Sequence, residues 1–322
     1  MPVVSATDEN VARAAEILRT GGIVAFPTET VYGLGADALS PAACARVFAA
    51  KRRPEFDPLI VHVEGMDALD GLVLRLDDRI RRVAAAFWPG PLTLVLPKTP
   101  RVPDLVTAGR PTVAVRVPAH PVARALLAAL GRPIAAPSAN PFGYLSPTTA
   151  EHVALQLGDA VEWILDGGPS SLGLESTIVD LSGDRPVLLR PGAVEVERLE
   201  PILGALDAPA THDPARAPGL SESHYAPHAR LRLLDGPATS DRVPSRVGLL
   251  AFRRPERAVS DAFATTEALA PSGDVVEAAA NLFACLHRLD RANLDAIWVE
   301  PVPLHGLGVA IADRLRRAAA RR

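Results

Sequence analysis

Short apolar runs alternate with stretches of helical periodicity along most of the chain, and this alternation restricts the fold more than any other feature. Helical periodicity over 8–20, with Thr7 or Asp8 as the N-cap, precedes an apolar run at 22–26. Ser40-Pro41 is typical of the cap and first turn of a second helix. Further strands are expected at 59–63, 92–96, 112–117, 133–137, 161–166, 176–181 and 186–190, with helices near 77–87, 119–130 and 148–157. The pattern predicts an α/β fold with a mixed sheet.

A stretch without periodicity divides the chain. Residues 205–230 are rich in proline and in small polar residues, which indicates a linker. The preceding residues, 1–204, form the expected mixed-sheet domain. Residues 231–322 predict a smaller α/β domain, with strands LRLLD, VGLLAF and DAIWVE and helices at 274–289 and 307–320. A length of 322 residues fits two domains.

Charge and cysteine usage exclude several classes of protein. The formal net charge is −3, and residues 1–205 carry 19 basic against 23 acidic side chains, so a broad basic surface for nucleic acid is not expected. No apolar run reaches the roughly 18 residues of a membrane span. Cys44 and Cys285 match no metal or redox spacing, and the N-terminus has no secretory signal pattern. We therefore expect a cytoplasmic protein without a disulfide framework.

Signatures of common nucleotide and metal sites are missing. The chain has no G-x-x-x-x-G-K-[ST] sequence, and the Gly-x-Gly at 33–35 lacks the third glycine of a dinucleotide fingerprint. Pro227 lies between His224 and His228 and prevents the regular helix that a histidine pair at this spacing needs. We therefore expect no protein-bound metal site and no tightly bound organic cofactor.

Polar side chains follow several predicted strands, where open α/β sheets bind ligands. Thr30 lies in PTETVYGLG (27–35), directly after a strand, and this segment suits a turn and a ligand-binding loop equally well. Arg116 lies inside a predicted strand and needs a partner, which is either a bound anion or a buried acidic residue. His62, alone in an apolar strand, is more typical of a core histidine.

Lysine is rare, and one of its two positions has a chemical interpretation. The chain has 32 arginines but only Lys51 and Lys98, a ratio that codon bias explains. Lys51 and Arg53 follow a predicted helix, where cations suit the helix dipole. The same pair, held by the prolines after it, suits a triphosphate, because an ammonium and a guanidinium recognise phosphate in different ways.

Laid side by side, these segments resemble the threonylcarbamoyl-AMP synthase family in its long, two-domain form. The matching stretches occur in family order and cover nearly all of 1–230: GGIVAFPTETVYGLGADA, KRRPEFDPLIVHV, FWPGPLTLVL, TVAVRVPAHP, PIAAPSAN, LGLESTIVD, VLLRPG and SHYAP. The resemblance implies a twisted, open, mixed-sheet YrdC-like domain at 1–204, a linker or lid at 205–230 and a smaller Rossmann-like α/β domain at 231–322.

The resemblance also implies an activity. Members of this family are nucleotidyltransferases that join L-threonine, bicarbonate and ATP into L-threonylcarbamoyl-AMP and release pyrophosphate. The product serves N6-threonylcarbamoylation of adenosine 37 in tRNA, so the tRNA threonylcarbamoyl transferase machinery is the expected recipient. Magnesium is expected with ATP, weak RNA binding is possible for such a protein, and no membrane is involved.

Residue by residue, the family's positions carry over as follows. Catalytic positions fall on Lys51, Arg53, Ser138 and Asn140, which form the Lys-x-Arg and Ser-x-Asn pairs. Threonine contacts fall on Thr30, His62, Arg116, Ser138 and Ser176. ATP contacts fall on Lys51, Arg53, Asp57, Thr112, Ala136, Ser146, Arg190 and Tyr225, and none of these positions is a metal ligand.

Physical chemistry is consistent with these roles. A carbamate formed from threonine is unstable in water, so a closed cavity would protect it, and a transfer of this kind depends on positioning and charge neutralisation. Lys51 and Arg53 would neutralise the phosphates, Arg116 would hold the threonine carboxylate, and Ser138 and Ser176 would orient the carbamate or threonine. Tyr225 lies in the linker, which would then fold back as a lid.

Two alternatives remain open. One is a double-stranded-RNA or tRNA-binding module, which the acidic balance of 1–205 disfavours. The other is a carbamoyl transferase that forms a carbamoyl-adenylate. The chain lacks the zinc-finger cysteines and the acylphosphatase-like extension that go with that activity.

Overall fold

The structure is a computed structural model that describes residues 2–209, 213 and 216–320. The chain divides into two compact units. The N-terminal unit comprises Met1–Phe142, Pro147–Ser171 and Glu175–Leu220, and the C-terminal unit comprises Gly143–Ser146, Leu172–Leu174 and Ser221–Arg322. Two short segments from inside the expected 1–204 domain thus belong to the second unit, and the 205–230 segment is shared between the two. Local sequence patterns do not reveal such packing, because it depends on contacts between residues far apart in the chain.

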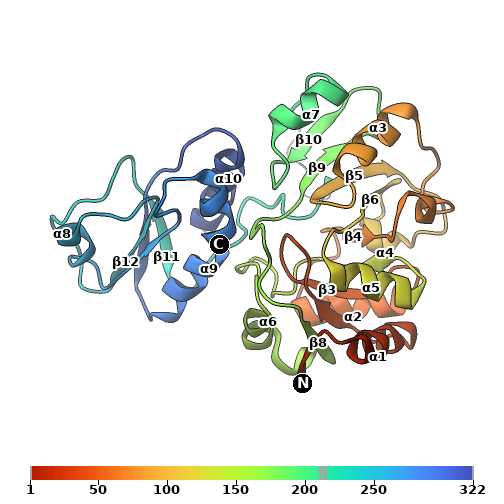
Figure 1. Ribbon diagram of the computed structural model, residues 1–322, viewed down its shortest axis with the longest axis horizontal. Helices are drawn as coiled ribbons and strands as arrows, with labels where there is room; N and C mark the ends of the chain where they lie inside the picture. Colours follow the sequence, from red (N-terminus) through yellow and green to blue (C-terminus); the bar gives the residue numbers. More distant parts are fainter. Residues whose placement is uncertain (1, 210–212, 214–215, 321–322) are drawn as a thin grey trace. The chain divides into compact units, whose positions relative to one another are not determined.

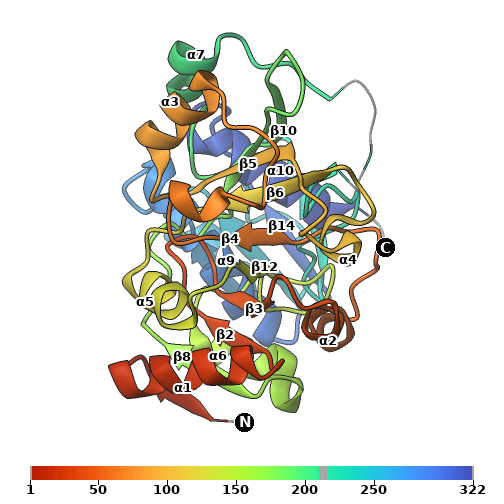
Figure 2. The same ribbon diagram turned by 90° about the vertical axis from the view of Figure 1, so that its right-hand side faces the viewer.

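The N-terminal unit contains the mixed sheet that the sequence predicts. Its strands follow the order β1-β8-β2-β3-β7-β4-β6-β5-β9-β10, and much of this succession can be followed from the bottom of Figure 2 upward. β1–β8, β8–β2, β4–β6 and β5–β9 pair in parallel, and the other neighbours are antiparallel. The strands are β1 (Val3–Ser5), β2 (Val24–Phe26), β3 (Gly33–Asp37), β4 (Ile60–His62), β5 (Leu92–Pro97), β6 (Thr112–Arg116), β7 (Ile134–Ala135), β8 (Trp163–Asp166), β9 (Thr177–Asp180) and β10 (Val187–Arg190).

Several helices begin at the N-cap residues that the sequence predicts. Thr7 Oγ1 accepts a hydrogen bond from Asn10 N at the first helix, and Ser40 Oγ caps the second, with Pro41 in its first turn. The helices are α1 (Asp8–Arg19), α2 (Pro41–Lys51), α3 (Asp78–Phe87), α4 (Asp104–Thr107), α5 (Pro121–Leu130), α6 (Ala150–Leu157) and α7 (Val196–Leu203). Short 3-10 turns form at Met66–Leu69 and Gly158–Ala160.

The two faces of the sheet are covered differently. On one face, α2, α3, α6 and α7 bury their apolar side chains in one large core with alternate strand residues such as Val61 and Val115. On the other face, α1 and α5 lie side by side (Figure 1), and their apolar residues pack against residues of β8, β2 and β7. The rest of this second face, over β4, β6, β5, β9 and β10, packs against a chain segment that contains Ala217 and Leu220. Polar side chains of this second face, such as His62 and Arg116, are buried.

β3 corrects one expectation from the sequence. Gly33–Asp37 is a strand of the sheet, whereas the sequence suggested that 27–35 is a turn or a ligand-binding loop throughout. A Cβ atom added at Gly35 would lie 2.7 Å from Ile134 Cγ2 and 2.8 Å from Phe26 Cε1. The glycine is therefore required by close packing inside the sheet, which composition alone does not distinguish from a turn.

The C-terminal unit is a smaller parallel α/β domain, as predicted. Its strands run in the order β11-β14-β12-β13, all parallel. They are β11 (Arg230–Leu233), β12 (Val247–Ala251), β13 (Thr265–Ala268) and β14 (Ala296–Val299), with helices α8 (Arg257–Ser260), α9 (Val275–Arg291) and α10 (Leu307–Ala319). Within the described ranges, no helix combines the length and the apolar character that crossing a membrane requires.

Candidate active site

Predicted site residues on the strands share one face of the N-terminal sheet. Thr112 and Arg116 alternate with core residues on β6, and His62 on β4 lies in register with Arg116. Ser176, just before β9, meets the same face, because its Oγ lies 2.8 Å from Oγ1 of Thr93 on β5. This is the face that α1 and α5 leave uncovered over β4, β6, β5 and β9.

Arg116 is held by an acidic residue that the sequence analysis did not assign. Its Nη2 donates to Glu29 Oε1 at 2.6 Å, its Nη1 to Thr30 Oγ1 at 3.0 Å and its Nε to Gly90 O at 3.2 Å. Burial opposes ionisation of Glu29, but the charge of Arg116 and the hydrogen bonds outweigh it, so the pKa of Glu29 lies below its usual value. The buried acidic partner is thus present. Contacts with the described residues use three of the five guanidinium N–H groups, so two remain for a ligand.

His62 is buried next to this pair. Burial, together with the neighbouring Arg116 charge, lowers the pKa of His62 to about 3. Its ring meets the ring of Phe26 edge to face, with centroids 6.2 Å apart, and Nδ1 has no hydrogen-bond partner among the described residues. At neutral pH the imidazole is therefore uncharged and offers a nitrogen to a ligand.

The Lys-x-Arg and Ser-x-Asn pairs come together in space. The last residue of α2, Lys51, donates from Nζ to the backbone oxygens of Ser138 and Asn140, in the loop that follows β7. The side chain is 1% exposed. Burial and the neighbouring Arg53 guanidinium lower the pKa of Lys51 well below its usual range, while Asp57 acts in the opposite direction. A polyanion bound here would favour the charged ammonium.

Arg53 and Asp57 form a buried ion pair beside Lys51. Arg53 Nη2 lies 2.9 Å from Asp57 Oδ2, and the guanidinium also donates to the backbone oxygens of Asp57 and Pro58 at 2.9 and 2.7 Å. Burial raises the pKa of Asp57 above its usual value, although the charges of Arg53, Lys51 and Arg190 act in the opposite direction. The cluster concentrates positive charge around one carboxylate in an N-terminal unit whose overall balance is acidic.

Ser176 and Arg190 form a further group. Arg190 donates to Ser176 O from Nε and Nη2 at 3.2 and 2.9 Å, to Ser176 Oγ at 3.2 Å, and to Pro218 O at 3.0 Å. Gly192 permits this arrangement, since a Cβ there would lie 2.4 Å from the backbone carbon of Ser176. The R-P-G sequence at the end of β10 thus packs against the residues that begin β9, and Arg190 attaches the 216–220 segment to the sheet.

The remaining predicted residues lie in different places. Thr112 begins β6, and Ala136 donates from its backbone nitrogen to Ile60 O at 2.9 Å. Ser146 and Tyr225 both belong to the C-terminal unit. Their positions in the sequence, inside the expected first domain and the linker, gave no sign of this.

Two residues that contact the predicted site residues were not themselves predicted from the sequence. Glu29 neutralises Arg116, and Thr93 bonds the hydroxyl of Ser176. Glu29 is the only acidic residue of PTETVYGLG and lies next to Thr30 in the sequence, so it could have been predicted as a site residue. Thr93 has no such signal, because its partner lies 83 positions away.

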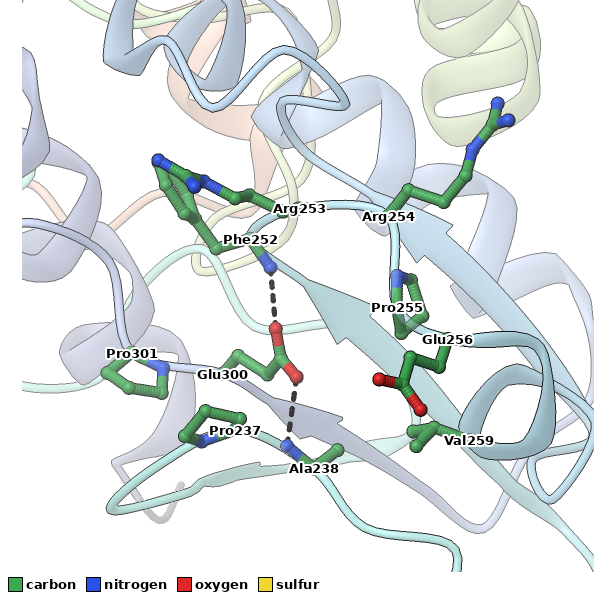
Figure 3. A pocket seen from close by; sticks show the side chains of 10 residues that line it. All are labelled: Pro237, Ala238, Phe252, Arg253, Arg254, Pro255, Glu256, Val259, Glu300 and Pro301. Atoms are coloured by element: carbon green, nitrogen blue, oxygen red, sulfur yellow. Dashed lines mark hydrogen bonds between the residues drawn. The ribbon is translucent and has the colours of Figure 1, made fainter.

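Metal ligands are not clustered in the described part of the chain. No group of three or more His, Cys, Asp or Glu side chains there is arranged to hold a metal ion. The C-terminal unit has a cavity of about 490 Å³ at the carboxyl ends of β11, β12 and β14. In Figure 3 the Glu300 carboxylate accepts from the backbone nitrogens of Ala238 and Phe252, at 2.9 and 3.0 Å. None of the predicted site residues lines this cavity.

Comparison with known proteins identifies the family. A family model described as "Telomere recombination" matches residues 16–192, and one described as "Threonylcarbamoyl-AMP synthase, C-terminal domain" matches 194–320. A threonylcarbamoyl-AMP synthase of Pyrococcus abyssi is 44% identical over 95% of this chain and 92% of its own length. One of Bacillus subtilis is 40% identical over 98% of this chain and 94% of its own.

A solved structure agrees over both units. The crystal structure of P. abyssi Sua5 complexed with L-threonine matches with a TM-score of 0.89 at 41% identity, covering 97% of this chain and 95% of that one. Sequence and fold therefore agree over nearly the whole length, and the chain belongs to the threonylcarbamoyl-AMP synthase family in its two-domain form.

Proposed function

We propose that this protein is an L-threonylcarbamoyl-AMP synthase. Near-full-length relatives bear this name, and a relative of the same fold is described in complex with L-threonine. In the proposed reaction, the threonine amine combines with bicarbonate to give a carbamate and water. A carbamate oxygen then attacks the α-phosphorus of ATP, and the bond to the β-phosphate breaks to release pyrophosphate. The enzyme is in this sense a nucleotidyltransferase.

The carrying observation is two buried polar groups in the N-terminal unit: Arg116 with His62 and Ser176 on one sheet face, and Lys51 with Arg53 at the end of α2. Arg116 has two N–H groups left by Glu29, Thr30 and Gly90, which suits the carboxylate of threonine. Neutral His62 and the Ser176 hydroxyl offer hydrogen bonds without adding charge. Lys51 and Arg53 supply the positive charge that a triphosphate requires.

The same groups would act mainly by positioning. The reacting carbamate and phosphate both carry negative charge, so bringing them together requires cations fixed in advance. Lys51 is fixed by two backbone carbonyls, and Arg53 by Asp57 and Pro58. Little reorganisation is then needed when ATP arrives. Ser138 and Asn140 share the loop that Lys51 anchors and would orient the carbamate.

Magnesium fits this site as an ion that arrives with ATP. The described residues form no cluster of three ligands, and the carboxylate among the cations, Asp57, is already paired with Arg53. Magnesium commonly keeps its waters and binds substrate phosphates with few protein ligands. When bound with ATP it would neutralise phosphate charge. We further propose that the product passes, in the cytoplasm, to the machinery that modifies adenosine 37 of tRNA.

Pyrophosphate release with single-substrate omission tests the proposal. The purified chain, given ATP and magnesium, is expected to release pyrophosphate only when L-threonine and bicarbonate are both present. Equal release without threonine would refute the assignment. Salt-dependent RNA binding without any ATP turnover would instead favour the RNA-binding alternative.

A further inference from the structure

Two segments of the C-terminal unit carry residues assigned to the nucleotide. Gly143–Ser146 contains Ser146, and Ser221–Ala226 contains Tyr225. The two segments are joined, since Ala226 N donates to Gly143 O at 2.9 Å. The first is also bound to α9, whose His287 donates from Nε2 to Ser146 O at 3.1 Å. Helices of the C-terminal unit thus set the conformation of both segments.

Tyr225 is held in an unusual conformation. It is 2% exposed, and its φ of 62° lies in the left-handed region that bulky residues rarely adopt. Its ring contacts the ring of Phe283 on α9, with centroids 5.8 Å apart, and Arg314 Cζ on α10 lies 5.1 Å from the ring centre. A strained residue persists only where its surroundings enforce it, and such residues concentrate at functional sites.

Arg314 is well placed to enforce this conformation. It is 1% exposed, and its Nη1 donates to Asp313 Oδ2 at 2.7 Å. Burial opposes ionisation of Asp313, but Arg314 and Arg317 outweigh it, so the pKa of Asp313 lies below its usual value. A buried cation with a fixed carboxylate partner presents a rigid plane to the tyrosine ring.

The backbone around Tyr225 is tied to the same end of α10. Arg317 Nη1 donates to Ser221 O at 2.8 Å, and His224 N donates to Arg317 O at 3.2 Å. Arg317 also bonds Asp313 from Nε, at 3.2 Å. One short stretch of α10 therefore fixes both the ring of Tyr225 and the backbone that leads to it.

We propose that Arg314 is a positioning residue for nucleotide binding, and that it acts by holding the ring of Tyr225. This rests on the proposed function and on the ATP contact that the family resemblance implies for Tyr225. The C-terminal unit then has a defined task, because its helices α9 and α10 arrange nucleotide-binding segments. Lysine does not reproduce the contact that Arg314 makes, since an ammonium keeps the charge but lacks the planar group that stacks on an aromatic ring.

The test compares Arg314→Lys with Arg316→Lys in the full-length chain. Arg316 is an exposed residue of α10 and undergoes the same chemical change. Arg314→Lys is expected to raise KM for ATP and the Kd of a non-hydrolysable ATP analogue on the order of tenfold, because the desolvated, stacked cation–π contact is weakened. In the Arg314→Lys variant, kcat and the KM for threonine are expected to change less than about twofold. Arg316→Lys is expected to leave kcat, both KM values and the Kd unchanged. An unaltered KM and Kd in a folded Arg314→Lys protein overturns the proposal.

A double-mutant cycle separates this role from general stabilisation. In a Tyr225→Leu background, Arg314→Lys is expected to add less than about a twofold effect, because the ring through which it acts is gone. A full tenfold effect there overturns the proposal. If Arg314→Lys does not fold, Phe283→Leu, which removes the other ring contact, is expected to raise the same KM and Kd, and no rise overturns the proposal.

The analogue-binding readout keeps the two proposals distinguishable. A wild-type chain that binds the analogue but releases no threonine-dependent pyrophosphate refutes the proposed reaction. In that case a tenfold weaker Kd in Arg314→Lys still supports the positioning role. A wild-type chain that binds no nucleotide overturns both proposals.

Discussion

The Glu29–Arg116 pair gives the most direct test of the site. Glu29 accepts from Arg116 with Oε1 and from Ala119 N and His120 N with Oε2, at 2.6, 3.0 and 3.3 Å. Glu29→Gln keeps the shape of the side chain, but its amide NH2 group must face at least one of these N–H donors, which it cannot accept from. The positive charge of Arg116 also loses its negatively charged partner. Breaking a buried ion pair from one side costs about 3–5 kcal/mol. At about 2–4 °C per kcal/mol, the melting temperature should fall by about 10 °C.

Thermal unfolding followed by circular dichroism measures this change, with Glu64→Gln, an exposed residue, as the matched control. The pKa of Glu29 is lowered from its usual 4.5, so the folded state binds this proton less readily than the unfolded chain. The pair's contribution is therefore complete above that value and is lost as pH falls through the folded pKa. A Glu29→Gln protein that melts within about 2 °C of the control at neutral pH would refute the reasoning.

Three further outcomes are expected. Lys51→Ala should lower kcat/KM for ATP about a hundredfold. Lys98 pairs with the exposed Asp104, so Lys98→Ala should leave the turnover of the folded enzyme nearly unchanged. Equal losses in the two variants would contradict the role of Lys51 in phosphate binding. The NMR signals of His62 should not titrate between about pH 5 and 8, and a titration midpoint near pH 6 would contradict this. The free energy of unfolding should also decrease as pH falls from 6.5 toward about 3, because in this range only the unfolded chain takes up the proton. Gly35→Ala should destabilise by about 1–3 kcal/mol in a denaturant titration, with Gly183→Ala, where a Cβ meets nothing within 4 Å, as the control; equal midpoints would contradict the packing argument.

Several features followed from the sequence because they depend on neighbours within a few residues. The caps at Thr7 and Ser40 and the α/β class are of this kind, and the structure confirms them. The family was also readable, since its motifs are short contiguous stretches. The individual roles of the predicted site residues stay predictions until the variants above are measured.

Other features arise only when distant segments meet. Sheet order places β7, β4, β6, β5 and β9 side by side, and this brings Arg116 to Glu29 across 87 positions and Ser176 to Thr93 across 83. Lys51 reaches the Ser-x-Asn loop across 87 and 89 positions. The sequence by itself determined which residue types are available and the local elements that carry them. Which buried charge meets which partner, and that Tyr225 is held by α10, depended on strand order and helix packing, because these set the distances between residues that no local pattern connects.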